Sequence, residues 1–204
     1  MGWWYHLNEE RIVCELKAGN YTVFREIVEL FKNRVYGMAY KFTNNYDEAQ
    51  DLSQEIFLKI YKEIGSFRFE SKLSTWIYRI SINTCLDWKR KNSKVKILST
   101  SIINDDDETI ELDIKDDNPL PDEAFIQSEN QREVHELIYG LPDKYKTVII
   151  MYHFNNMSYQ DISLALNIPE RTVETRLYRA RRLMKDELIK LNERGGYNWN
   201  AKKS

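Results

Sequence analysis

Basic and polar side chains that can donate hydrogen bonds recur along the segment from Ser158 to Arg182. An α-helix turns by about 100° per residue, so one side of a helix in this segment would present four of these side chains. Arg179 and Lys185 would lie beside them. These four are Arg171, Thr175, Tyr178 and Arg182. Guanidinium and hydroxyl groups at this spacing suit the phosphates and base edges of a major groove. The pattern predicts a helix that contacts duplex DNA. The alternative is the solvated face of an ordinary helical hairpin.

The surrounding sequence predicts the short helix and the turn that such a helix needs beside it. Ser158 and Asp161 have the spacing of a capping box, and Asn167 followed by Pro169 ends the first helix. Beyond Pro169, apolar residues recur at steps of three and four and predict a buried stripe. The stripe comprises Val173, Leu177, Ala180, Met184, Leu188 and Leu191. We therefore expect a helix-turn-helix.

Charge divides the 204 residues into three parts. Residues 1–92 carry 14 Lys and Arg against 12 Asp and Glu, residues 93–128 carry 3 against 10, and residues 129–204 carry 13 against 10. Pro and Gly are scarce, which favours helix. We predict an all-α fold of two small helical domains, at 1–92 and 124–204, joined by an acidic flexible linker at 93–123. The second domain holds the helix-turn-helix and a C-terminal tail.

The sequence lacks the usual patterns of an enzyme, a metal site or a membrane span. Cys14 and Cys85 are far apart and have no CxxC or Cys/His spacing. The sequence has no nucleophile elbow and no glycine-rich phosphate loop. No apolar run approaches the roughly 18 residues that cross a bilayer. We expect a cytoplasmic protein that is not an enzyme and has no catalytic residues, cofactor or metal.

A helix expected at 47–64 has a mixed face opposite its buried stripe. Asp51, Gln54 and Leu58 point away from the core on this face, with Glu55 at its margin. An exposed leucine among carboxylates suggests a surface that binds another protein. The alternative is that Leu58 packs on a neighbouring helix.

An aromatic and basic loop at 67–72 precedes a helix expected at 73–91. Phe67 and Phe69 could stack on unpaired bases while Arg68 and Lys72 hold phosphates. A polar stripe along the helix continues this chemistry through Thr75, Arg79, Asn83 and Arg90. The alternative is that the two phenylalanines close the end of the bundle and the stripe is only solvated.

The segment from Ser93 to Glu123 is acidic, and we expect it to be extended when the protein is free. It would either occupy a positively charged channel built for nucleic acid or serve as a solvated spacer. Further helices are expected at 123–139 and 143–154.

Taken together, these motifs resemble the extracytoplasmic-function (ECF) sigma factors, the small two-domain promoter-specificity subunits of bacterial RNA polymerase. The resemblance covers nearly the whole chain. It rests on Tyr46–Tyr61, Ser66–Asp87, Leu141–Tyr145 and the helix-turn-helix. It implies core RNA polymerase and promoter DNA as partners. An anti-sigma factor, often membrane-anchored, commonly silences such proteins, and the resemblance implies such a partner here too.

The resemblance also implies roles for individual residues. The helix that docks on the clamp helices of the polymerase would present Asp51, Gln54, Glu55, Phe57 and Leu58. The minus-ten element would be melted and read by Phe67, Arg68, Phe69, Lys72, Trp76, Arg79 and Asn83. The minus-thirty-five element would be read by Arg171, Thr175, Arg176, Tyr178, Arg179 and Arg182. Family members usually carry Lys or Arg at the position of Glu174, so this residue should shift the preferred upstream element.

Two other classes of function fit parts of the pattern. One is a stand-alone helix-turn-helix regulator whose first domain senses a signal or dimerises. The other is a protein that binds single-stranded RNA through the loop at 67–72. Neither class needs to bind core polymerase, which separates both from a sigma factor.

Overall fold

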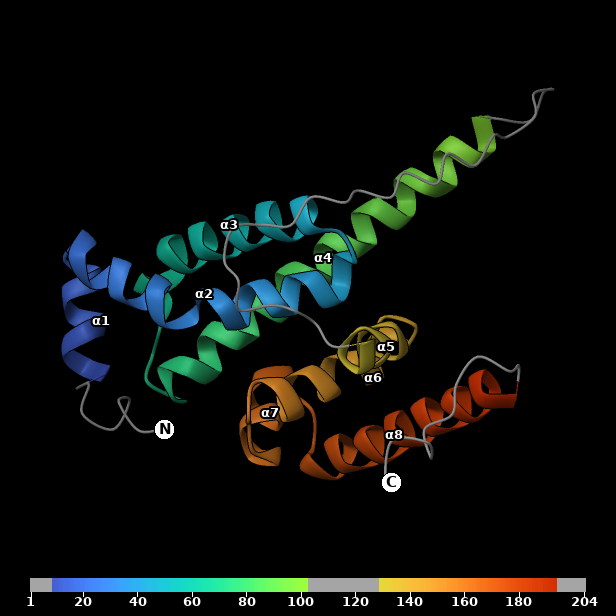
Figure 1. The fold of residues 1–204 in the computed structure, drawn as a ribbon. Helices are drawn as coiled ribbons and strands as arrows, with labels where there is room; N and C mark the ends of the chain where they lie inside the picture. Colours follow the sequence, from blue (N-terminus) through green and yellow to red (C-terminus); the bar gives the residue numbers. More distant parts are fainter. Residues whose placement is uncertain (1–8, 103–128, 194–204) are drawn as a thin grey trace.

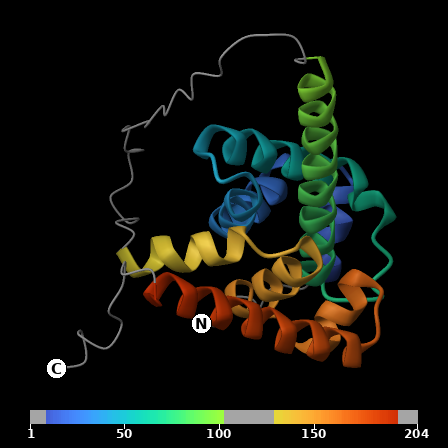
Figure 2. The same ribbon diagram turned by 90° about the vertical axis from the view of Figure 1, so that its right-hand side faces the viewer.

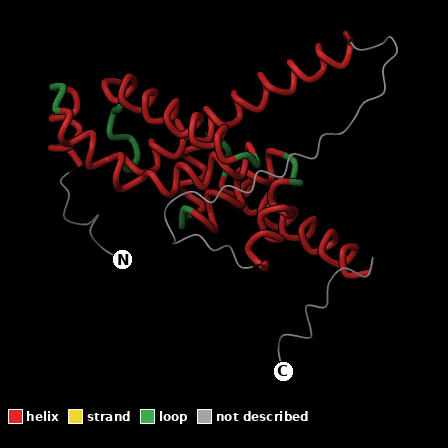
Figure 3. The backbone as a smooth tube through the Cα atoms, turned by 45° about the horizontal axis from the view of Figure 1, so that its top comes forward, coloured by secondary structure: helices red, strands yellow, loops and turns green. Residues whose placement is uncertain are grey.

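The computed structural model describes residues 9–102 and 129–193, which form two packed groups of helices with no strand in either range (Figures 1 and 3). The first group consists of α1 (Glu9–Lys17), α2 (Tyr21–Thr43), α3 (Tyr46–Glu63), a 3₁₀ turn (Ile64–Ser66) and α4 (Leu73–Ile102). The second consists of α5 (Glu129–Tyr139), α6 (Asp143–Ile149), a π-helical turn (Ile150–Phe154), α7 (Tyr159–Leu166) and α8 (Glu170–Glu193). The predicted all-α class is confirmed.

Asparagines set the boundaries of the first long helices. The side chain of Asn20 accepts a hydrogen bond from the Thr22 amide at 3.0 Å and caps α2. Asn44 ends α2 in a left-handed conformation, with φ of 55°. Asn45 then caps α3 by accepting from the Glu48 amide at 3.0 Å. The break expected at Asn44-Asn45 is therefore a reversal between two packed antiparallel helices.

The core of the first group lies where α2, α3 and α4 meet. Each helix contributes one apolar face at helical spacing, as the sequence predicts. The completely buried side chains include Phe31, Val35, Phe42, Leu52, Ile56, Ile77 and Ile82. This core fixes the outward directions of the opposite faces of α3 and α4.

The fourth helix is longer than expected. It continues to Ile102, so the prediction of extended chain from Ser93 is wrong for residues 93–102. No Pro or Gly interrupts the sequence between Leu73 and Ile102, and the run of acidic residues begins only at Asp105. The rest of the expected linker, the start of the helix expected at 123–139 and the C-terminal tail beyond 193 lie outside the described residues.

The helix-turn-helix forms with the expected caps. Ser158 Oγ accepts a hydrogen bond from the Asp161 amide at 3.0 Å at the start of α7. Asn167 ends α7 with φ of 51°, and α8 starts directly after Pro169. The buried stripe is confirmed at Val173, Leu177 and Ala180.

The second half of α8 departs from the predicted stripe. Met184 and Leu188 are only half-buried and Leu191 is 40% exposed, so the prediction of burial is wrong for Leu191. The physical reason is that neighbouring helices cover only the first half of this 24-residue helix. None of the helices in the described ranges is both long and apolar enough to cross a membrane.

The two groups of helices pack directly on each other (Figure 2). The first part of α4 lies against α7, and α2 lies against α5. Across the second contact the rings of Tyr40 and His135 stack with centroids 4.5 Å apart. Lys41 Nζ lies 4.1 Å from the centroid of the Phe154 ring. Aromatic and cationic side chains thus fill the junction between the domains.

Lys146 is fully buried at this junction. Its Nζ lies 5.4 Å from the ring centroid of Phe42, across the junction, and 4.6 Å from that of Tyr139. No hydrogen-bond acceptor contacts Nζ. Burial, with a smaller contribution from Lys89 and against the attraction of Asp143, lowers the pKa of Lys146 to about 8. The charged amine therefore contacts two ring faces and no hydrogen-bond acceptor, and its desolvation destabilises the packed domains.

We expect Lys146→Met to stabilise the protein at pH 7. A pKa lowered from 10.5 to about 8 means that burying the charged form of Lys146 costs about 3 kcal/mol. The two ring contacts offset about 1–2 kcal/mol of this cost. Removing the charge should therefore raise the free energy of unfolding by about 1–2 kcal/mol. Urea unfolding followed by circular dichroism measures this change.

The pH dependence gives a second readout of the same substitution. The unfolded chain keeps the proton of Lys146 up to pH 10.5, whereas the folded chain loses it above about pH 8. The free energy of unfolding of the wild type should consequently rise as the pH is raised from about 8 to 10.5. The rise should be smaller in Lys146→Met. Lys190→Met, at a side chain that is 58% exposed, is the control and should change neither quantity. A loss of stability in Lys146→Met at pH 7 would contradict this account.

Candidate DNA-binding and protein-docking surfaces

The outward side of α8 presents the basic residues that the sequence singles out. Arg171, Tyr178, Arg179 and Arg182 are exposed, and Tyr178 is 66% exposed. Thr175 is also exposed, and its hydroxyl donates to the Arg171 carbonyl at 2.8 Å. The helix is anchored from behind by Val173 and Leu177, so these side chains share one direction. A rigid helix with this face has the chemistry for phosphate and base contacts.

Polar and aromatic side chains surround the basic residues of α8. A hydrogen bond from Arg179, with help from Lys144, lowers the pKa of the Tyr145 hydroxyl, although partial burial opposes the shift. Arg181 approaches His153 Nε2 at 3.4 Å and lies over the Tyr152 ring. Arg182 Nε lies 3.9 Å from the Asp186 carboxylate, whereas Arg179 and Arg181 have aromatic or polar neighbours. Their charge stays available to an anionic partner.

The loop before α4 differs from the expectation of two exposed aromatic rings. Phe67 is only 3% exposed and packs on Trp76 and Phe69, with ring centroids 5.5 and 4.9 Å away. The expectation that the Phe67 ring is exposed to stack on a base is therefore wrong. Phe67 instead packs into the core of the first domain, against Trp76 of α4. Trp76 is half-buried against it.

Phe69, in the same loop, is exposed to solvent. It is 45% exposed and adopts a left-handed backbone conformation with φ of 60°. For a bulky side chain this conformation costs about 1–3 kcal/mol and occurs mainly where function requires it. Lys17 helps to hold the loop by donating to the Phe67 carbonyl at 3.3 Å. Phe69 and the neighbouring exposed Arg68 are thus presented to solvent.

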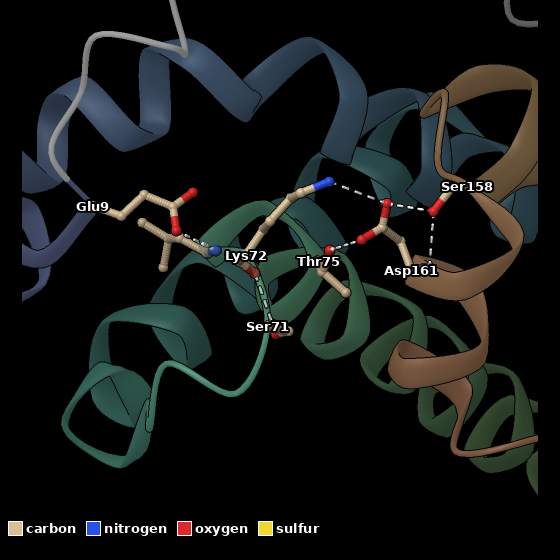
Figure 4. Close-up of polar contacts among 7 residues, drawn as sticks. Glu9, Ser71, Lys72, Thr75, Ser158 and Asp161 are labelled. Carbon is tan, nitrogen blue, oxygen red and sulfur yellow. Dashed lines mark hydrogen bonds and ion pairs between the residues drawn. The ribbon is translucent and has the colours of Figure 1, made fainter.

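The polar stripe of α4 meets the second domain. Asp161 of α7 accepts hydrogen bonds from Lys72 at 3.5 Å and from Thr75 at 3.3 Å (Figure 4). The same carboxylate accepts from the Ser158 hydroxyl at 2.7 Å. Burial alone would raise its pKa, but the Ser158 hydrogen bond and the charge of Lys72 outweigh burial, so the pKa of Asp161 is lowered. Thr75 is buried by this contact, although the sequence placed it on a free stripe.

Further along α4, a cleft of about 450 Å³ separates the two domains. Arg79 and Asn83 line one side of it. Arg176, Asn167 and Lys144 line it from the second domain. Residues expected to read the minus-ten element and one expected to read the minus-thirty-five element therefore face the same space.

The outward face of α3 carries the residues expected to bind another protein. Asp51, Gln54 and Glu55 are exposed, and Leu58 is 59% exposed. Phe57 is half-buried against the core. The alternative expectation, that Leu58 packs inside the bundle, is wrong because Leu52, Ile56 and Ile60 occupy the inward face. An exposed leucine ringed by polar groups is typical of a binding surface.

Several residues at the domain junction have no role in the sequence-based expectations. Asp161 is predictable as a helix cap, but its contact with Lys72 depends on how the domains pack. Likewise, nothing in the local sequence indicates that Lys146 and His135 are buried, because their burial arises from α2 of the other domain. In residues 9–102 and 129–193, no three His, Cys, Asp or Glu side chains are grouped as they would be to hold a metal ion.

Comparison with known proteins identifies the two domains. The sequence profile of Sigma-70 region 2 matches residues 27–95, and that of Sigma-70, region 4 matches residues 131–184. The chain is 34% identical over 176 residues to the ECF RNA polymerase sigma factor SigW of Bacillus subtilis, covering 86% of this chain and 94% of that protein. It is 30% identical over 174 residues to the RNA polymerase sigma-H factor of Pseudomonas aeruginosa, covering 85% and 90% of the two chains.

Solved structures share the fold. The structure of CnrH in complex with the cytosolic domain of CnrY matches with a TM-score of 0.63 and 17% identity, over 87% of this chain and 95% of that one. The sigma factor RpoE of Bartonella quintana, crystallised with the anti-sigma factor NepR, matches with a TM-score of 0.62 and 20% identity, over 81% and 96%. The sequence likeness to SigW extends over both domains. The chain therefore belongs to the ECF sigma factors, which regulate transcription and are not enzymes.

Proposed function

We propose that this chain directs core RNA polymerase to specific promoters and helps to melt the minus-ten element, without catalysing a reaction itself. The observation that carries the proposal is that three helices expose faces of different chemistry. The face of α3 around Leu58 is exposed and mixed, the stripe of α4 around Arg79 and Asn83 is polar, and the face of α8 around Arg179 is basic. Each face lies opposite a buried apolar stripe, so the fold presents all three outward.

The face of α3 suits a protein partner. Leu58 offers an apolar centre, and Asp51, Gln54 and Glu55 form a polar rim. This arrangement of apolar centre and polar rim is typical of protein interfaces. We assign this face to the clamp helices of the largest polymerase subunit.

The loop at 67–72 and the first turns of α4 suit single-stranded DNA. The exposed ring of Phe69 can stack on a base, while Arg68 and Lys72 can contact phosphates. Trp76 lies behind the loop and holds Phe67 in place. A base flipped from the duplex would be held between this loop and the α4 stripe.

The basic face of α8 suits the major groove of the minus-thirty-five element. Arg171, Thr175, Arg176, Tyr178, Arg179 and Arg182 supply its donors. Glu174 lies among them and is exposed, so it would repel phosphate or accept from a cytosine amino group. An anti-sigma factor, of the kind bound to the related RpoE, is a further partner that we propose for this chain.

Leu58→Arg should abolish stable binding to core polymerase. The substitution places an unpaired charge at the centre of the proposed interface, and truncating a side chain that is a hot spot of an interface costs about 2 kcal/mol or more. Retention of purified core enzyme on the tagged chain measures the effect. Leu164→Arg, at a leucine of α7 that is 50% exposed, is the matched control and should bind like wild type. Equal binding by the two variants would exclude α3 as the docking surface.

Arg179→Ala should weaken recognition of the minus-thirty-five element. We expect a loss of about 1–3 kcal/mol if the guanidinium contacts a base, and a smaller loss if it contacts only phosphate. Titration of the polymerase holoenzyme on promoter duplexes gives the affinity. Lys190→Ala, near the far end of the same helix, should leave it unchanged. Wild-type affinity and salt dependence in Arg179→Ala would remove this residue from the interface.

Asn83→Ala should spare polymerase binding but slow opening of duplex promoters. Its side chain lies on the α4 stripe and is exposed, so its loss leaves the fold intact. Permanganate footprinting of the melted region measures open complexes. The deficit should shrink on a template that already contains an unpaired minus-ten bubble. A variant that opens duplex DNA as fast as wild type has no melting role at this position.

A further inference from the structure

The first helix, α1, contacts both ends of the loop at 67–72. At the start of α1, Glu9 Oε2 accepts a hydrogen bond from the Leu73 backbone amide at 3.1 Å (Figure 4). At the end of α1, Lys17 Nζ donates to the Phe67 carbonyl at 3.3 Å. Phe67 is the first residue of the loop and Leu73 directly follows it. Two charged side chains of one helix therefore hold the two ends of the loop.

The contact from Glu9 replaces a helix cap that the local sequence lacks. The Trp76 amide donates to the Lys72 carbonyl at 3.1 Å, which places Lys72 at the cap position of α4. A lysine side chain has no acceptor for the free amides of the first turn, unlike the Asn and Ser side chains that cap α2, α3 and α7. The Glu9 carboxylate supplies an acceptor and a negative charge, and both stabilise a helix N-terminus. The start of α4 thus depends on a residue 64 positions away from Leu73 in the chain.

Lys17 also contacts the exposed ring of the loop. Its Nζ lies 5.8 Å from the centroid of the Phe69 ring, within the roughly 6 Å over which a cation attracts an aromatic face. One ammonium group therefore contacts both the Phe67 carbonyl and the Phe69 ring. Phe69 has the left-handed backbone conformation, which persists only where the surrounding structure holds it.

The middle of the loop has few contacts of its own. In residues 9–102 and 129–193, no backbone hydrogen bond involves Arg68, Phe69 or Glu70. The Phe69 ring packs on the buried Phe67 ring, with centroids 4.9 Å apart. The direction of Phe69 is therefore set by Phe67 beneath it and by Lys17 beside it.

The helix that carries Glu9 and Lys17 is itself fixed to the core. Ile12, Val13 and Leu16 of α1 are buried. The helix packs on α2 and on the 3₁₀ turn that precedes the loop. Its nine residues span about 12 Å at about 1.5 Å per residue. A short packed helix thus keeps its two charged ends at a set distance along the loop.

We propose that α1 sets the conformation of the loop at 67–72 for binding unpaired minus-ten DNA, with Glu9 and Lys17 as positioning residues that act through Leu73, Phe67 and Phe69. The profile of Sigma-70 region 2 matches residues 27–95, so α1 lies outside it. The proposal rests on the proposed function, which assigns the exposed Phe69 ring to base stacking.

Hydrogen exchange in the full free chain tests the role of Glu9 without DNA. Glu9→Ala removes the acceptor of the Leu73 amide, so exchange in a peptide at 67–73 should be about fivefold faster. Glu9→Gln keeps a side-chain oxygen that can accept and should retain most of the protection. The helices α2 and α3 should exchange as in wild type in both variants.

Glu10→Ala is the matched control for Glu9→Ala. Both glutamates lie in the first turn of α1, and Glu10 is exposed, so the control removes the same charge without removing the contact. Its exchange at 67–73 should equal that of wild type. Equal exchange in Glu9→Ala and Glu10→Ala, or no protection in Glu9→Gln, would overturn the role of Glu9.

Fluorescence of 2-aminopurine tests the consequence for DNA. The probe is the non-template strand of a promoter that the polymerase holoenzyme transcribes, with 2-aminopurine at one minus-ten position at a time. Lys17→Met should weaken binding of this strand to the holoenzyme about fivefold and alter the fluorescence of the bound probe. Lys17→Arg should restore both, because a guanidinium can also donate to a carbonyl and contact a ring. Binding of core polymerase through α3 should not change in either variant.

Three results would overturn the role of Lys17. One is wild-type affinity and fluorescence in Lys17→Met. Another is a lack of recovery in Lys17→Arg. The third is weaker binding of Lys17→Met with the bound probe fluorescing as in wild type, which would mean that Lys17 contacts the DNA itself.

Failure of this role and failure of the proposed function are distinguishable. A wild-type holoenzyme that neither transcribes from defined promoters nor binds the single strand would refute the proposed function, whatever the exchange of the free chain. A wild type that binds the strand, with Glu9→Ala and Lys17→Met binding equally well, would refute only the role of α1.

Discussion

One carboxylate, that of Asp161, takes part both in the cap of a helix and in the contact between the two domains. Asp161 completes the cap of α7 through Ser158, and it accepts hydrogen bonds from Lys72 and Thr75 of the other domain. The position of the helix-turn-helix over α4 therefore depends on the same group that starts its first helix. Both contacts use the ionised form, whose pKa the hydrogen bond from Ser158 and the charge of Lys72 lower despite burial. These polar contacts join α4 to α7, while ring contacts such as Tyr40 on His135 join α2 to the second domain.

The distribution of buried and exposed faces explains how one small chain can bind several partners. Each of α3, α4 and α8 buries an apolar stripe and leaves residues of the opposite face exposed. The faces differ in chemistry: apolar with a polar rim on α3, polar on α4, and basic on α8. Because the faces belong to separate helices, a partner at α3 does not occupy the exposed face of α8. All three faces are exposed with the domains packed against each other.

Local patterns were sufficient to predict most of the fold. Asn44-Asn45, Ser158 and Asn167 mark helix ends through their own side-chain and backbone chemistry, so they could be recognised in the sequence. The buried Phe67, the buried Lys146 and the exposed Leu191 could not, since each depends on which neighbour covers it. The first part of the expected linker was misjudged because it lacks helix breakers and continues α4 to Ile102. Roles of individual side chains in binding remain predictions.

The central claim is that this chain gives core polymerase its choice of promoter. Run-off transcription on a library of duplex templates, with core enzyme in the presence or absence of the chain, tests it most directly. The account predicts transcripts that start at defined positions only when the chain is present, downstream of a shared pair of sequence elements. Transcripts that are independent of the chain, or that start without any shared element, would contradict it.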